Sequence, residues 1–69
     1  MDQEYIEALH LNPNHRFEQI SNRSENRKGQ DTDFYEYREY DQDGNLVGTF
    51  TIADSTCIYP PQKRTIRRL

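Results

Sequence analysis

Histidine and cysteine are the side-chain types best suited to nucleophile and general-base chemistry near neutral pH. The chain carries His10, His15 and Cys57, and no spacing among them indicates that they meet. It also lacks a glycine-rich phosphate loop, and a sheet of 69 residues leaves little room for a sizeable pocket. We therefore expect a protein without catalytic activity or cofactor, in which Cys57 is a small buried hydrophobic residue.

An acidic run around Gly44 is the one segment that invites comparison with a calcium-binding loop. With Gly44 at the sixth position of an EF-hand loop, three acidic residues fall at positions one, three and five: Glu39, Asp41 and Asp43. Position twelve is then Phe50, where calcium requires a bidentate Glu, and the flanks have strand rather than helix patterns. The lone Cys shows no zinc-ligand spacing either. The sequence therefore predicts no metal site.

The last seven residues form a basic tail that could neutralise phosphates, and it contains Lys63, Arg64, Arg67 and Arg68. Three tyrosines could serve as stacking platforms for unpaired bases: Tyr35, Tyr37 and Tyr59. However, residues 1–54 hold twelve acidic and five basic side chains, a balance of −7, whereas residues 55–69 hold four basic ones, +4. An acidic body repels a nucleic-acid backbone. Nucleic-acid binding is therefore the alternative hypothesis. We rank it below the interpretation that the tail is solvated or paired with the domain's own acidic side chains.

The element that must position any site is a β-hairpin spanning residues 33–53. Two aromatic and β-branched runs flank the turn Asp41-Gln42-Asp43-Gly44, which fits a type I turn with Gly44 in the left-handed region. Residues 40–47 (YDQDGNLV) resemble the hairpin unit of tyrosine–aspartate repeat proteins. The resemblance covers eight residues, occurs once, and implies a hairpin but no activity.

The turn also sets the predicted register, because pairing Asp41 with Asn45 makes the numbers of opposing residues add to 86. Alternation of side chains then predicts two faces. The face expected to be the core carries Phe34, Tyr40, Leu46, Phe50 and Ile52. The face expected to be exposed carries Tyr35, Tyr37, Val47, Thr49 and Thr51. We expect Tyr35, Tyr37 and Val47 to form an apolar contact surface for another protein or a second copy of the chain.

Shorter elements are expected on either side of this hairpin. Residues 2–11 show helical spacing of apolar residues and end before Pro13, with a strand as the alternative. Residues 15–20 favour a strand, and residues 21–33, which contain no apolar side chain, predict a solvated loop. Residues 57–59 resume a strand that Pro60-Pro61 stops, and residues 60–69 are either a basic tail or an edge strand.

Together these patterns predict a single small domain, residues 1–69, of mainly β class with a small α+β fold as the variant. Its architecture is a three- to four-stranded antiparallel meander centred on the hairpin, with at most one short N-terminal helix. No segment approaches the ~20 apolar residues of a membrane span. With an acidic N-terminus unlike a secretory signal and one free Cys, the sequence predicts a cytoplasmic, non-enzymatic interaction module.

Overall fold

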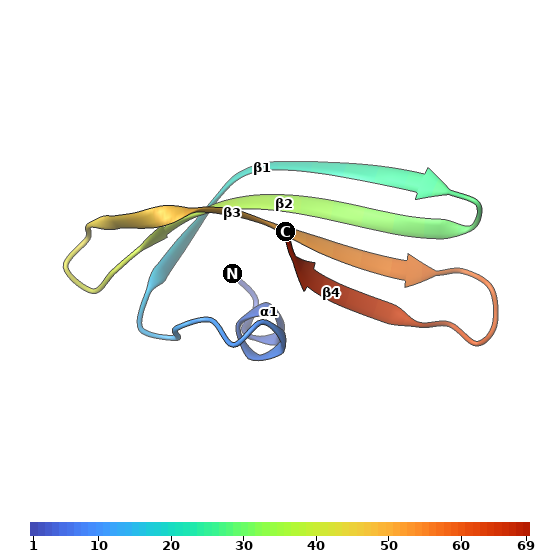
Figure 1. Cartoon of the computed structure of the whole chain (residues 1–69), viewed down its shortest axis with the longest axis horizontal. Coiled ribbons are helices and arrows are strands. Elements are labelled where there is room, and N and C mark those ends of the chain that lie inside the picture. The colour runs from blue at the N-terminus through green and yellow to red at the C-terminus, as the bar shows by residue number, and fades with distance from the viewer.

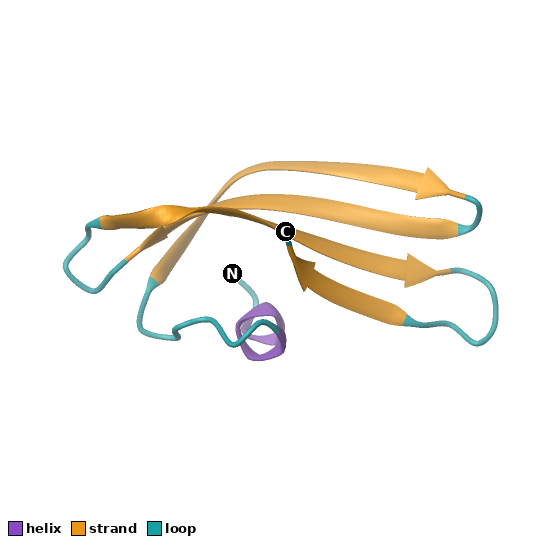
Figure 2. Ribbon diagram, in the orientation of Figure 1, coloured by secondary structure: helices purple, strands orange, loops and turns teal.

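The computed structural model describes all 69 residues and contains one open antiparallel sheet and one short helix (Figures 1 and 2). Four strands follow one another in the order β1-β2-β3-β4: β1 (Arg16–Arg27), β2 (Gln30–Tyr40), β3 (Leu46–Cys57) and β4 (Arg64–Arg68). The helix α1 (Gln3–Ala8) precedes them. This arrangement confirms the predicted mainly β meander with one N-terminal helix, and residues 64–68 form an edge strand.

The turn between β2 and β3 has the predicted geometry. The Asp41 carboxylate accepts hydrogen bonds from the backbone N–H groups of Asp43 and Asn45, each 2.9 Å long, and Gly44 has φ +85°. The Asp41 N–H donates to the Asn45 carbonyl at 2.9 Å, and Tyr40 pairs with Leu46. These backbone hydrogen bonds hold the pKa of the exposed Asp41 carboxyl below its usual range.

Beyond Tyr40–Leu46 the predicted register is wrong by one residue. Glu39 pairs with Gly48, so Val47 has no partner and forms a β-bulge. Every later pair is shifted: Tyr37 faces Phe50, and Tyr35 faces Ile52. The bulge therefore places the two tyrosines on the same face as Phe50 and Ile52, whereas the alternation of residues predicts them on the opposite face.

The predicted loop at residues 21–33 is also wrong, since the chain there forms the second half of β1 and the first third of β2. A two-residue turn joins them, with positive φ at Lys28 (49°) and Gly29 (79°) and Arg27 paired with Gln30. Such turns follow the natural twist of a hairpin. Residues 21–33 lack apolar side chains, but cross-strand hydrogen bonds link Ser24 to Asp33 (2.6 Å) and Asn26 to Asp31.

The core lies between α1 and one face of the sheet, and its buried members are Tyr5, Leu11, Tyr37, Phe50 and Ile52. The predicted helix is shorter than residues 2–11, because the helical segment ends at Ala8 and His10 adopts a positive φ of 54°. Figure 2 shows α1 and the following loop on a single side of the sheet, so the opposite face has no second layer. No helix of the structure has the length and apolar character needed to cross a membrane.

Candidate functional site

The predicted contact residues do not form one surface. Tyr37 is 5% exposed and belongs to the core, and Tyr35 is half-buried beside it. Val47, the bulged residue, is 54% exposed. On the face expected to be buried, Leu46 is 58% exposed, while Phe34 is half-buried on the uncovered side of the sheet. The reason is the one-residue shift at Val47, which exchanges the two faces of β2 relative to β3.

A free strand edge adjoins Leu46 and Val47. Strand β4 pairs only with Ile52–Thr56 of β3, and the last backbone hydrogen bond on that side runs from the Leu69 N–H to the Thr51 carbonyl at 2.8 Å. Residues 46–50 therefore have a neighbouring strand on the β2 side alone. Because N–H and C=O groups alternate in direction along a strand, those of Thr49 point to the same open side as those of Thr51.

The side chains along this free edge differ from those along the other edge of the sheet. Residues 46–50 read LVGTF and carry no charge. The other edge strand, β1, is almost wholly exposed and carries charged side chains such as Arg23, Glu25 and Arg27. Charges on an edge strand discourage pairing with another chain. The β1 edge is protected in this way and the β3 edge is not.

The four basic residues of the C-terminal segment are divided between different contacts. The Arg64 guanidinium donates two hydrogen bonds to Asp54, from Nε (2.9 Å) and Nη2 (2.6 Å), and also contacts Glu4. The guanidinium of Arg68 lies 4.5 Å from the ring centre of Phe50. Arg67 projects from the opposite face, since β4 alternates, and Lys63 lies in the preceding loop. Arg64 and Arg68 are thus engaged within the fold.

The Asp54 contacts also fasten α1 to the sheet. Asp54 is buried, at 8% exposed, and accepts a hydrogen bond of 2.8 Å from the Tyr5 hydroxyl on the helix. Arg64, followed by the Tyr5 hydroxyl, lowers the pKa of Asp54. Burial raises the pKa of Tyr5, and its hydrogen bond to Asp54 raises it further. A charged Asp54 that accepts one hydrogen bond from Tyr5 and two from Arg64 explains how a six-residue helix keeps its position.

His15 and Cys57, two of the three residues with side chains suited to catalysis, are held apart. His15 Nδ1 lies 2.6 Å from Oε2 of Glu39, and Glu39 pairs with Gly48 near the N-terminal end of β3. Cys57 lies at the other end of β3, about 30 Å away at ~3.3 Å per strand residue, and is partly exposed rather than buried. The structure does not bring these groups together.

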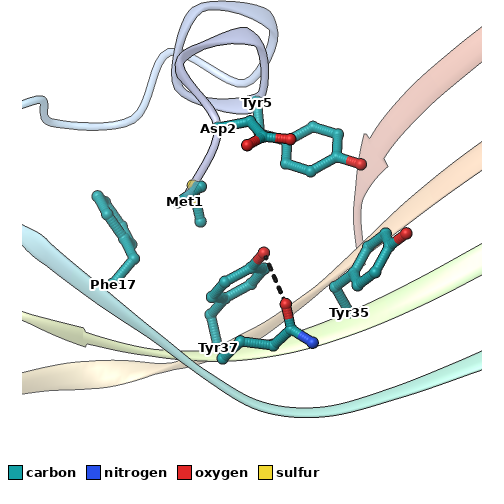
Figure 3. A pocket seen from close by; sticks show the side chains of 7 residues that line it. Met1, Asp2, Tyr5, Phe17, Tyr35 and Tyr37 are labelled. Atoms are coloured by element: carbon teal, nitrogen blue, oxygen red, sulfur yellow. Dashed lines mark hydrogen bonds between the residues drawn. The ribbon is translucent and has the colours of Figure 1, made fainter.

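An aromatic cavity of about 260 Å³ lies between α1 and the sheet, and no sequence pattern indicated it (Figure 3). Its walls come from three elements and the N-terminus, and they comprise Met1, Asp2, Tyr5, Phe17, Gln19, Tyr35 and Tyr37. Figure 3 shows Tyr35 and Tyr37 on the sheet side, opposite Met1, Asp2 and Tyr5. The contributing positions are spread over 37 residues, so no local spacing could have revealed the cavity.

Comparison with family models, curated proteins and solved structures finds no match to this chain.

Proposed function

We propose that this chain is a non-enzymatic protein-interaction module that binds an extended segment of another protein along residues 46–50 of β3. The observation that carries the proposal is the uncharged open edge, with Leu46 and Val47 exposed beside unpaired backbone groups. A partner strand added there would complete the row that β4 begins. Main-chain hydrogen bonds supply affinity in such β-augmentation, and side-chain pockets supply specificity.

Leu46 and Val47 account for the apolar part of the proposed contact. Each exposes more than half of its surface, and a strand paired to the edge would cover part of that surface. Of the three contact residues predicted from the sequence, Tyr35, Tyr37 and Val47, the proposed contact therefore includes only Val47. A second copy of the chain is the other candidate occupant, since an edge can pair with itself across a two-fold axis.

Nucleic-acid binding remains the alternative, and it has less support. Two of its four basic residues, Arg64 and Arg68, already contact Asp54 and Phe50, which leaves Lys63 and Arg67. Two charges give weak and strongly salt-dependent attachment. The free thiol of Cys57 agrees with a cytoplasmic location, which we include in the proposal.

Peptide selection and mapping test the proposed edge. Peptides selected from a random nine-residue display library are added to labelled protein, and backbone amide shifts are followed by NMR. We expect the largest changes within residues 46–50 and expect binding to persist at high salt. Thr49→Pro removes an outward N–H and Val47→Lys adds an edge charge, so both should abolish binding.

The matched control is Asn22→Lys, which adds the same charge to the opposite edge strand and should leave binding unchanged. Shifts confined to β1, or equal loss in all three variants, would contradict the proposal. If the molecular mass in solution corresponds to a dimer, and Thr49→Pro reduces it to that of a monomer, a second copy of the chain is the occupant of the edge. Binding of single-stranded oligonucleotide that disappears with Arg67→Ala and with added salt would favour the alternative.

A further inference from the structure

We propose that the aromatic cavity between α1 and the sheet binds a quaternary ammonium head group, that is, a trimethylammonium cation on a short stem. Four aromatic rings line it, from Tyr5, Phe17, Tyr35 and Tyr37. A cation over an aromatic face is attracted by the electron-rich centre of the ring, and several rings around one cation form an aromatic cage. This site is separate from the β3 edge, so it does not depend on the proposed protein contact.

The rings are held in place by their neighbours. Tyr37 stacks on Phe50 with ring centres 6.0 Å apart, and Phe17 meets Phe50 edge-on at the same separation. The Tyr5 hydroxyl is bound to Asp54 at 2.8 Å, and the Tyr5 ring lies 6.0 Å from that of Tyr35. The cavity walls are therefore ordered before any ligand arrives, which lowers the entropic cost of binding.

Charge favours a cation over an anion or a neutral group. The one acidic side chain in the lining is Asp2, and none of the lining side chains is basic. Burial, and next the negative charge of Asp2, raise the pKa of Tyr37, so its hydroxyl stays neutral.

The size of the cavity selects a small head group. Its volume of about 260 Å³ lies below the ~300–1,000 Å³ of pockets that enclose drug-sized ligands. A trimethylammonium group matches such a space and carries no hydrogen-bond donor, so a lining in which four of the seven residues are aromatic leaves none of its polar groups unsatisfied. Such a group occurs both in choline-type molecules and in trimethylated lysine side chains, and the test includes both sources.

The test titrates the protein with choline and with its uncharged carbon analogue, 3,3-dimethylbutan-1-ol, while tyrosine ring signals are followed by NMR. Choline should bind at least tenfold more tightly than the alcohol, because only choline is attracted to the rings and Asp2. A peptide containing trimethyllysine is compared with the same peptide unmodified, and tighter binding by the methylated form supports the site. Whichever cation binds more tightly identifies the source.

Variants decide whether the cavity is responsible. Tyr35→Leu should weaken choline binding five- to tenfold, and Asp2→Asn should weaken it several-fold at low salt only. Tyr59→Leu, a change to a tyrosine that is 61% exposed outside the cavity, should have no effect. A urea unfolding curve for each variant shows that the fold is retained. Equal binding of choline and the alcohol, or equal effects of Tyr35→Leu and Tyr59→Leu, would overturn the proposal.

Discussion

Deleting Val47 should leave the fold intact, because the bulge makes this residue supernumerary in the β2–β3 ladder. Tyr40 already pairs with Leu46 and Glu39 with Gly48, so removal of Val47 joins two existing pairs without shifting either side. Tyr37 would still face Phe50 on the helix side of the sheet. A one-residue deletion in a regular hairpin would instead send one set of side chains to the wrong face.

The size of the effect follows from burial. Val47 is 54% exposed, so a little under half of its surface is buried, and full burial of such a side chain is worth about 1.5–3 kcal/mol. The deletion should therefore lower the free energy of unfolding by about 1 kcal/mol. A chain of this length has a total of about 3–10 kcal/mol at ~0.05–0.15 kcal/mol per residue, so the variant should remain folded.

Deletion of Thr51 is the matched control. With Ile52 kept opposite Tyr35, the shortened strand moves Phe50 from its 5%-exposed position to the uncovered face and puts Thr49 in its place. Loss of a buried Phe costs about 3–5 kcal/mol, which approaches the whole stability of the chain. Urea unfolding and NMR contacts between Tyr37 and Phe50 measure both variants. If the Val47 deletion costs as much as the Thr51 deletion, or loses the Tyr37–Phe50 contact, the bulge reasoning is refuted.

Three further changes probe the turn and the helix attachment. Gly29→Ala should cost at least about 1–2 kcal/mol in urea unfolding, because φ +79° strains any side-chain-bearing residue and the added Cβ would also clash with the Tyr59 ring, whereas Gly48→Ala, which meets open space, should cost less. Tyr5→Phe should cost about 1.5–3 kcal/mol by removing a hydrogen bond to the buried Asp54 carboxylate; a neutral result would contradict its role in holding α1. Because the folded-state pKa of Asp54 lies below the unfolded value of ~3.9, its contribution is present above pH ~4 and is lost as the pH falls further. In Arg64→Met the unfolding free energy should fall less steeply as the pH decreases, because Arg64 is the main cause of the lowered Asp54 pKa. Unfolding curves measured between pH 2 and pH 6 would show this difference.

Much of the fold was predictable because it depends on local chemistry. The turn at Asp41 needs only its own carboxylate, the adjacent N–H groups and a Gly able to take φ +85°. The edge strand at residues 64–68 follows from alternation around Ile66. In contrast, the β1–β2 hairpin has no apolar residues in residues 21–33 and a turn of Lys28-Gly29. The turn signals expected from sequence are Asn-Gly or Asp-Gly, so these strands were predicted as a loop.

The candidate sites were less predictable. Of the contact residues named from sequence, only Val47 lies on the proposed edge, and Leu46 was assigned to the core. The edge itself is free because β4 pairs with Ile52–Thr56 and no further, which no feature of residues 46–50 reveals. The cavity requires Tyr5 from the helix and Tyr35 from β2 to lie 6.0 Å apart.

The sequence by itself determined the β class, the short helix and the position of the central turn, because each depends on propensities and hydrogen bonds within a few residues. Only the tertiary structure decided which face of β2 is buried. The bulge at Val47 shifts the β2–β3 register by one residue and so places Tyr35 and Tyr37, rather than Phe34, on the buried face. The hydrophobic pattern does not reveal this shift, because both faces of β2 carry aromatic residues. The open edge depends on how far β4 pairs along β3, and the aromatic cavity depends on how α1 packs against β1 and β2, so both are also products of long-range contacts.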